Sequence, residues 1–243
     1  MVVNHPYIPA VDDDAVLWRY MDVLKFFSLL QHRTLFFPCA SVFDDRWEGS
    51  VSPINHLVRP TLYAELPEEH RKKLNEAHSL AIQQMRDVIC VSCWHESEHE
   101  SLAMWNQYAP RGLGVAVQTS YRNVRQALID APQTIIGGRV RYFDPRKQGV
   151  PDHNTYLPYF HKRKSFEHER EVRLIIDLQA PPPQNLGSAT GLNIPTDVDI
   201  LVQRVFLAPA TPEWSTSAVE AAVRAFGYQF EVTQSALDDP AVY

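Results

Sequence analysis

A charged run between Lys162 and Arg173 is the part of this sequence best suited to chemistry. It contains Glu167, Glu169 and Glu171 at every second position, followed by Arg173. If the run is a strand, these side chains project from one face, because side chains alternate along a strand. Neighbouring carboxylates repel one another, so at least one pKa should rise unless cations intervene. Arg173 can keep Glu171 ionised, which would leave Glu169 the more perturbed carboxyl unless Lys162 or Arg163 folds back over it. The run could equally be a solvated edge strand of mixed charge.

A second block combines a serine, a histidine and aromatic residues. Ser92 and His95 lie at the end of a predicted strand, and Trp105 and Tyr108 follow at helical i, i+3 spacing. Two aromatic rings near a hydroxyl and an imidazole could form a slot for a flat ring. Trp105 could instead pack in the core.

Two further polar blocks lie nearer the N-terminus. Arg19 and Tyr20 lie on a predicted strand. Asp44, Asp45 and Glu48 belong to a polar-aromatic loop. Their carboxylates could bind a cation, or they could cap the helix that follows.

Hydrophobic periodicity predicts the elements that position these blocks. Strands are expected at 17–21, 34–37, 88–94, 115–118, 135–143, 166–178, 192–194, 202–207 and 228–232. Helices are expected at 22–30, 54–85, 101–108, 121–129 and 212–226. Asp22 and Ser101 are predicted helix caps, and Gly137 and Gly138 indicate a bulge or a close backbone approach. A turn at 111–114 and a surface loop at 180–192 complete the pattern.

The strands cluster and the helices intervene irregularly, without a repeated βαβ pattern. This favours an α+β fold with a central, mostly antiparallel or mixed sheet and flanking helices. We expect a single domain over 16–243, preceded by a flexible N-terminal arm at 1–15. An ADP-ribosyltransferase-like arrangement is compatible with this pattern.

Composition narrows the possible functions. The chain has 243 residues and a net charge of -6, which argues against broad nonspecific binding to nucleic acid or anionic lipid. We find no phosphate-binding loop, dinucleotide glycine fingerprint, H-E-x-x-H motif or nucleophile elbow. No signal peptide or membrane span is visible, so we expect a soluble, cytoplasmic protein.

The three cysteines are Cys39, Cys90 and Cys93. An odd count beside apolar runs does not indicate a disulfide framework. Cys90 and Cys93 have C-x-x-C spacing, but the sequence has no second such pair. We therefore expect both to be reduced core residues that bind no metal, and elemental analysis of purified protein would test this.

Together, the four blocks resemble the domain of unknown function 2971 family. That family shows an aromatic-basic strand, an F-x-D-x-x-E-G loop, an S-C-W…E-S-x-x-M-W-x-x-Y block and a K-R-x-x-F-x-x-E-x-E-x-R strand. The corresponding segments here are 19–20, 43–49, 92–117 and 162–173. The last two are the most specific, and the resemblance covers about residues 16–235.

The first functional hypothesis is an enzyme of the ADP-ribosyltransferase or NAD-glycohydrolase type. Such a site needs a residue that grips the dinucleotide, aromatic rings that stack on nicotinamide, and a glutamate that stabilises an oxocarbenium-like transition state. Arg19, Ser92 with Tyr108, and then Glu169 or Glu171 occur in that order. This hypothesis makes Glu171, Glu169, Tyr108 and Ser92 catalytic. It makes Arg19, Tyr20, His95, Trp105, Arg163 and Arg173 contacts for NAD.

Two other classes of function fit the same residues. A metal-dependent hydrolase or nuclease would use hard oxygen ligands. The candidates are Asp44, Asp45, Glu48, His95, Glu169 and Glu171. A noncatalytic ligand-binding module is the third class. Under the first hypothesis the substrate is a small nucleotide, the acceptor could be a nucleic acid or a protein, and the setting could be bacterial defence or toxin action.

Overall fold

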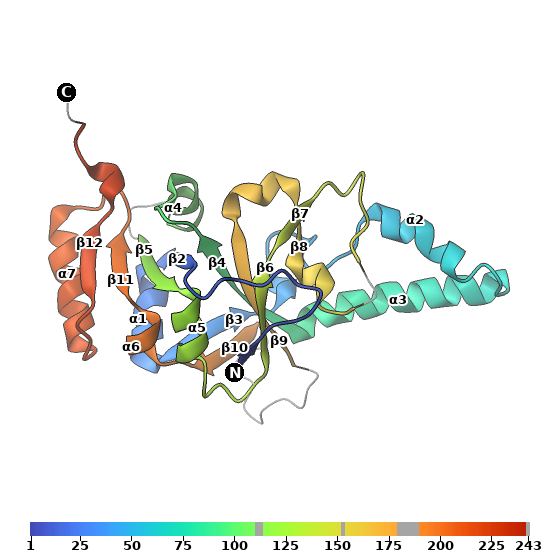
Figure 1. Ribbon diagram of the computed structural model, residues 1–243, viewed down its shortest axis with the longest axis horizontal. Coiled ribbons are helices and arrows are strands. Elements are labelled where there is room, and N and C mark those ends of the chain that lie inside the picture. Colours follow the sequence, from blue (N-terminus) through green and yellow to red (C-terminus); the bar gives the residue numbers. More distant parts are fainter. Residues whose placement is uncertain (110–113, 152–153, 179–189, 242–243) are drawn as a thin grey trace.

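Within the described residues 1–109, 114–151, 154–178 and 190–241, the computed structural model contains a mixed sheet of eight strands (Figure 1). The strands are β1 (Val2–Val3), β2 (Val16–Asp22), β4 (Ile89–Glu96), β5 (Gly114–Ser120), β6 (Ile135–Arg139), β9 (Glu171–Asp177), β11 (Arg204–Leu207) and β12 (Glu231–Gln234). Their order across the sheet is β1-β6-β9-β4-β2-β5-β11-β12. The β1–β6 and β11–β12 pairs are parallel and the others are antiparallel. The predicted α+β class with a mixed central sheet in a single compact domain is confirmed.

Two small sheets and several helices surround the long sheet. β3 (Thr34–Pro38) pairs antiparallel with β10 (Gly191–Pro195), and β7 (Arg141–Phe143) pairs parallel with β8 (His161–Arg163). The α-helices are α1 (Val23–His32), α2 (Pro53–Leu62), α3 (Glu68–Val88), α4 (Leu102–Tyr108), α5 (Tyr121–Ala127), α6 (Val198–Leu201) and α7 (Glu213–Ala225). The 3-10 helices are η1 (Ala40–Val42), η2 (Leu157–Phe160), η3 (Lys164–Glu169) and η4 (Ala236–Asp238). Both predicted caps are confirmed, since Asp22 accepts a hydrogen bond from the Lys25 amide and Ser101 from the Met104 amide.

The apolar side chains form three buried clusters. The largest joins the sheet to α1, α5, α6, α7 and the β3–β10 pair. A second cluster packs Val91 and Ile175 against Leu157 and Phe160 of η2. In the third, Trp105 of α4 packs with neighbouring aromatic residues of β2. These clusters hold α4 and η2 against the sheet, and both elements contribute to the candidate site.

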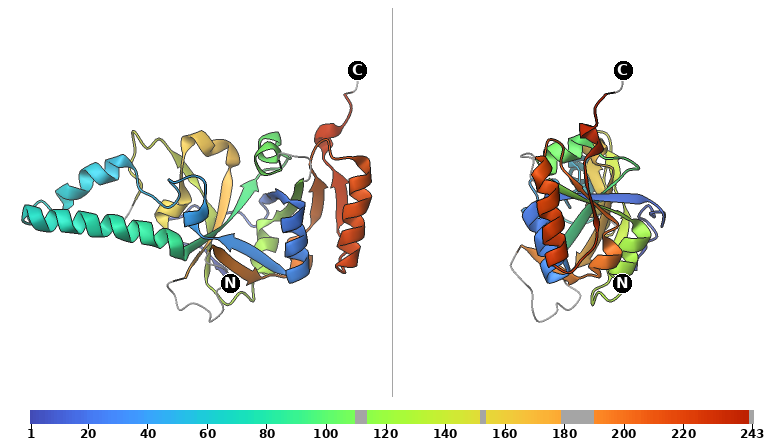
Figure 2. Two further views of the ribbon diagram at one scale, coloured as in Figure 1. Left: turned by 180° about the vertical axis from the view of Figure 1, so that it is seen from behind. Right: turned by 90° about the vertical axis from the view of Figure 1, so that its left-hand side faces the viewer.

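The α2–α3 pair projects from the body of the molecule at the end opposite α7 and β12 (Figures 1 and 2). α3 has 21 residues and none is buried. Leu57 and Leu62 of α2 are 74% and 68% exposed. A helix that buries so little cannot be held by core packing, so this hairpin depends on contacts at its base. No helix in the described ranges is long and apolar enough to cross a membrane.

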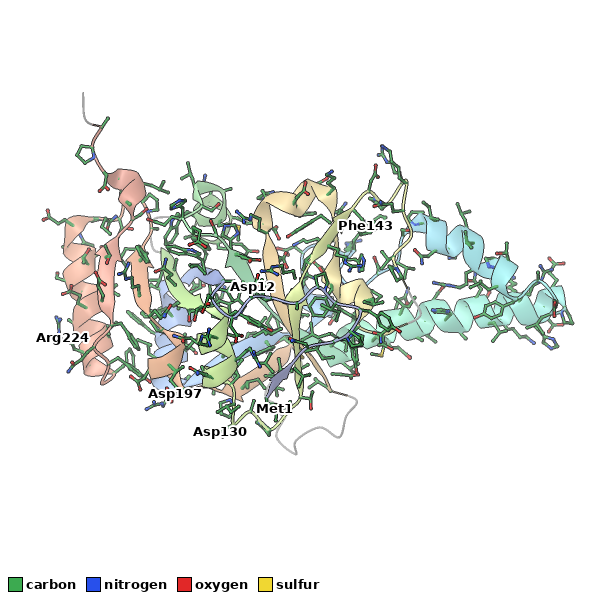
Figure 3. The ribbon with its side chains drawn as sticks, in the orientation of Figure 1. Met1, Asp12, Asp130, Phe143, Asp197 and Arg224 are labelled. Carbon is green, nitrogen blue, oxygen red and sulfur yellow. The ribbon has the colours of Figure 1, made fainter. Side chains whose placement is uncertain are left out.

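The N-terminal segment expected to be a flexible arm packs against the sheet. β1 pairs with β6, and Ile8 and Val11 are buried. Arg139 of β6 donates hydrogen bonds to the Ala10 carbonyl and to Asp12, which Figure 3 labels where the segment crosses the sheet. The buried apolar residues and these polar contacts explain why a polar, acidic stretch is docked.

Several predicted element boundaries are corrected. The predicted strand at 166–178 begins instead at Glu171, after η3 and a left-handed turn at Arg170 (φ 41°). The predicted strand at 135–143 is divided between β6 and β7, which belong to different sheets. The last strand is β12 rather than 228–232. Most of the predicted turn at 111–114 and of the loop at 180–192 lies outside the described residues.

The close backbone approach predicted for the glycine pair is confirmed. A Cβ atom on Gly138 would lie 2.1 Å from Ile8 Cγ2, and one on Gly137 would lie 2.2 Å from the Tyr121 hydroxyl oxygen. Among the described residues, that hydroxyl is buried without a hydrogen-bond partner. The glycines therefore let β6 pass beneath the N-terminal segment and α5.

This arrangement predicts coupling between Gly137 and Tyr121. Gly137→Ala should destabilise the fold by about 1–3 kcal/mol, because the added methyl group overpacks the site. Tyr121→Phe removes the hydroxyl that the methyl group would meet, and it should itself cost little because that hydroxyl is unpaired. In the Tyr121→Phe background, Gly137→Ala should therefore cost less, as a double-mutant cycle of urea unfolding would show. Additive free energies would contradict the packing.

Candidate active site

The candidate site lies where the sheet forks. β4 and β9 pair continuously from Ile89 opposite Asp177 to His95 opposite Glu171. β2 and β4 pair only through Leu17–Glu96 and Trp18–His95, although both strands continue. Polar side chains of β2 and β4 can therefore enter the space between the strands.

Arg173 of β9 is the centre of a buried charged network. Its guanidinium makes a two-pronged contact with Glu48, with N–O distances of 2.7 and 2.9 Å. Its Nε donates to Glu171 at 2.5 Å, and Nη1 also donates to the Tyr159 carbonyl at 2.6 Å. Arg173 is 1% exposed. Such planar, paired contacts are how a buried guanidinium is satisfied.

Lys162 of β8 is the second cation of this network. Its ammonium lies 2.5 Å from Glu169, 2.5 Å from Glu171 and 3.3 Å from Glu48. The backbone amide of Glu171 also donates to the Tyr142 hydroxyl at 2.8 Å. The three carboxylates are each at most 5% exposed. We call Glu48, Lys162, Glu169, Glu171 and Arg173 the carboxylate cluster.

The carboxylate cluster contains three carboxyl groups and two cations, so one carboxyl lacks a full counter-charge. Burial would raise the pKa of Glu171, but Arg173 and Lys162 hold it well below its ordinary value. Burial and the neighbouring Glu171 raise the pKa of Glu169 to about 7. Burial opposes the charge of Lys162, yet the surrounding carboxylates raise its pKa. Glu171 therefore has the lower pKa and Glu169 the higher pKa of the E-x-E pair, although Lys162 folds back over Glu169 and contacts both carboxylates.

The backbone that presents the cluster differs from the predicted strand. Glu167 lies in η3 and is exposed, so it is not part of the carboxylate row. The left-handed conformation of Arg170 then turns the chain into β9, and both flanking glutamates reach Lys162. Gly49 also has a positive φ of 69°, and a Cβ there would lie 2.3 Å from the Tyr159 ring. Glycine is thus needed beside Glu48.

Residues of α4 and β4 cover the Glu169 side of the cluster. Gln107 donates to Glu169 at 3.0 Å, and the neighbouring Tyr108 is 41% exposed. His95 Nδ1 lies 2.6 Å from the Glu169 carbonyl oxygen. A carbonyl can only accept, so Nδ1 carries the proton, and burial lowers the pKa of His95. Polar groups therefore contact both the side chain and the carbonyl of Glu169. Tyr108, the residue after Gln107, is exposed at the surface.

Arg19 and Ser92 form a second polar group at the fork. Arg19 donates to the Ser92 hydroxyl and to the Phe36 carbonyl, and it lies over the Trp94 ring at 5.5 Å. Within the described residues, no carboxylate lies within 4.0 Å of Arg19. Burial lowers its pKa to about 10, against the opposing influence of Cys93 and of a tyrosine on α4. Arg19 is thus a half-buried cation held by neutral acceptors.

The five residues expected to line one pocket fall into two groups. Leu17 and Val172 both face the main core. By strand alternation, Arg19 leaves the sheet on this face and Glu171 on the other. Tyr108 lies between the two groups: burial raises its pKa, and Cys93 and both glutamates of the E-x-E pair raise it further. The five residues therefore do not line one face of the sheet, and Tyr108 has charged neighbours in both groups.

Several residues expected to contact a cofactor have other contacts. Trp105 is 2% exposed and donates to Glu100, while the Tyr20 hydroxyl accepts from the Ser101 amide. Both belong to the core, which corrects the idea of a two-ring slot. The donors of Arg173 are committed to the carboxylate cluster.

Arg163 lies on the far side of the cluster from α4. It pairs with Asp45 at 2.9 Å and lies between the Trp47 and Phe166 rings. Arg163, Asp45 and Trp47 border a cavity of about 10 Å³, room for roughly one water molecule. Its lining includes Glu48, His161, Lys162 and Phe143, the last labelled in Figure 3. The cavity is too small for a nucleotide.

Three of the proposed metal ligands converge, but on the ammonium of Lys162. Asp45 pairs with Arg163, while Glu48, Glu169 and Glu171 face Lys162. No group of three or more potential ligands that could hold an ion occurs among the described residues. Strand positions three apart face opposite ways, so the Cys90 and Cys93 sulfurs point to different sides of β4.

Sequence reasoning did not place three of the central residues. The sequence pattern indicates Glu48 only as a cation ligand or a helix cap and Lys162 only as a charge at the start of the charged run. It gives no indication of a role for Gln107. The signal for Glu48 was its position beside a glycine in a polar loop. Their convergence brings together the Glu48 loop, α4 and β8, which are distant in sequence.

Comparisons with known proteins do not identify a family or a function for this chain. No family model matches the sequence, and no curated protein shows significant similarity to it. The candidate site therefore has to be judged on its geometry.

The raised pKa of Glu169 predicts a pH-dependent stability difference. Between its ordinary value of 4.5 and about 7, folded Glu169 holds a proton that the unfolded chain releases. This contribution to stability is therefore lost as pH rises through that interval. Glutamine cannot titrate, so the free energy of unfolding of Glu169→Gln minus that of wild type should increase from pH 5 to pH 7.5.

Glu171→Gln is the matched control and should show the opposite trend. The pKa of Glu171 is lowered, so its contribution is present above 4.5 and is lost as pH falls. The variant should be most destabilised at neutral pH and approach wild type in acid. Urea unfolding from about pH 3 to about pH 7.5 measures both differences, and parallel profiles for the two variants would refute the assigned ionisation states.

Proposed function

We propose that this chain is an enzyme that breaks or transfers a glycosidic bond of a nucleotide-type substrate, in the manner of ADP-ribosyltransferases and NAD glycohydrolases. The observation that carries the proposal is the geometry of the Glu169–Glu171 pair: both carboxylates contact Lys162 at 2.5 Å, and Glu171 also contacts Arg173. Gln107, which donates to Glu169, is followed by the exposed Tyr108. Pairs of acids whose surroundings push their pKa values apart are characteristic of acid–base sites.

The two glutamates suit different parts of such a reaction. Ionised Glu171 can stabilise the positive charge that develops on the sugar as the bond to the leaving group lengthens. Glu169, with a pKa of about 7, can hold or release a proton near neutral pH. Tyr108 offers the exposed aromatic surface on which a flat base could stack. Gln107 and His95 orient Glu169 through its side chain and its carbonyl.

Arg19 supplies the charge that an anionic substrate needs. Lys162 and Arg173 are paired with carboxylates, whereas within the described part of the chain Arg19 donates to a hydroxyl and a carbonyl and lies over the Trp94 ring. A guanidinium has five N–H donors in a planar fork that matches phosphate geometry. A dinucleotide with its base on Tyr108 could therefore place its phosphates at Arg19.

The metal-dependent alternative has less support, because the candidate carboxylates face lysine or arginine. The resemblance to the domain of unknown function 2971 family fits a common site, since residues from all four blocks lie at or beside the fork. A nucleic acid or protein acceptor, and a role in bacterial defence or toxin action, belong to the same proposal.

Nicotinamide release from NAD tests the reaction. Glu171→Gln should lower turnover per folded molecule by about 2–4 kcal/mol of transition-state stabilisation, roughly 30- to 1000-fold. The structure also changes the expectation for folding: Glu171 faces both Lys162 and Arg173, so the variant should lose stability as well. Turnover must therefore be measured below the variant's melting temperature, with the folded fraction determined by circular dichroism.

Glu48→Gln is the matched control, because Glu48 contacts the same two cations from the side away from α4. It should lose stability but keep near-wild-type turnover per folded molecule. Equal turnover in wild type and Glu171→Gln would remove Glu171 from catalysis. Stabilisation by NAD without nicotinamide release would instead indicate a binding module, and absence of both would reject NAD.

A separate measurement tests Arg19. Arg19→Gln should weaken the binding of ADP-ribose by about 1.5–3 kcal/mol, the usual worth of hydrogen bonds to a charged group. Isothermal titration calorimetry measures this loss directly. Arg33→Gln is the control, since Arg33 is an exposed arginine paired with Asp199, and it should bind like wild type. Equal affinities for both variants would contradict phosphate binding at Arg19.

A further inference from the structure

Cys39 and Cys90 form a buried thiol pair that the proposed function does not use. Cys39 directly follows β3 and Cys90 lies on β4, and the two residues form an isolated antiparallel bridge. Their sulfur atoms lie 3.0 Å apart. The side chains are 3% and 0% exposed, and all three cysteines are free thiols.

We propose that Cys39 and Cys90 are a site of reversible oxidation, at which a small peroxide converts the two thiols into a disulfide. Opposite residues of an antiparallel bridge have a Cα separation of about 4.5–5.5 Å, within the range that disulfides span. Because the sulfurs are already in contact, closure needs only a small movement of two side chains. This proposal does not depend on the glycosidic chemistry.

The two thiols have different chemical roles. A hydrogen bond from Cys90 lowers the pKa of Cys39, whereas the contact with Cys39 and burial raise the pKa of Cys90. The Cys39 thiolate attacks one peroxide oxygen, the O–O bond breaks, and the leaving hydroxide takes up a proton to become water. This step gives a Cys39 sulfenic acid. The Cys90 sulfur then attacks that sulfur, and its proton leaves with the hydroxyl group as a second water.

The position of the pair gives the bond a structural effect. The residues are 51 positions apart, and the chain between them includes the Glu48 loop and the whole α2–α3 hairpin. A disulfide would therefore close the base of the projecting hairpin covalently. Closing a long loop restricts the unfolded chain, so the oxidised protein should be the more stable form.

Cys93 provides an internal comparison. It lies on the same strand but on the opposite face from Cys90, beside the carboxylate cluster. Burial and Glu171 raise its pKa, so it should be a poor nucleophile towards peroxide. A selective reaction at Cys39 and Cys90 would therefore reflect their geometry rather than general thiol reactivity.

The test treats the full native chain with hydrogen peroxide and maps the products by mass spectrometry. We expect loss of two hydrogen masses, a linked peptide pair containing Cys39 and Cys90, one remaining free thiol, a higher melting temperature, and reversal by dithiothreitol. Cys93→Ser should give the same linked pair. Cys39→Ser should give no intramolecular link in the folded state.

If Cys39→Ser fails to fold, the peptide map of the peroxide-treated wild-type protein still tests the proposal. A link from either residue to Cys93, oxidation of Cys93 alone, or no Cys39–Cys90 link in native protein would overturn it. The same treatment in urea shows whether the peroxide is active, since unfolded thiols should oxidise without selectivity.

Discussion

The guanidinium of Arg173 is the group on which the arrangement of the candidate site depends. It joins the Glu48 loop, the η2 carbonyl of Tyr159 and the Glu171 carboxylate to one strand of the sheet. A buried charge is tolerated only when it is paired, and breaking such a pair costs about 3–5 kcal/mol. The loop, η2 and β9 are therefore held in register by a single side chain, and Lys162 gains its neighbours from the same constraint.

The charge balance of this network is the basis of the proposed chemical role. Two cations can neutralise two carboxylates, and the carboxyl left over is Glu169, next to α4. The surplus negative charge raises the pKa of Glu169, whereas Glu48 and Glu171 are paired with Arg173. A purely structural network would gain nothing from a third buried acid, since burying an uncompensated charge costs free energy. This cost favours a chemical role for the Glu169 side of the carboxylate cluster.

The hairpin shows how unevenly stability is distributed. α2 and α3 project from the body with little buried surface, whereas the fork is dense with buried charge. The chain enters the hairpin after the Glu48 loop and leaves it directly into β4. Any constraint at its base, including a bond between Cys39 and Cys90, therefore acts on two elements of the candidate site. Local opening should begin in the hairpin and end at Arg173.

By itself, the sequence determined the α+β class, the helices with capping residues such as Asp22 and Ser101, and the close approach at Gly137. These follow from local periodicity and hydrogen bonding. Only the tertiary structure brought Glu48 to Arg173, opened the sheet beside Arg19, and buried rings expected to bind a ligand. Such outcomes depend on contacts between residues far apart in the chain, whose pairing is decided by packing and burial and leaves no periodic signal in the sequence.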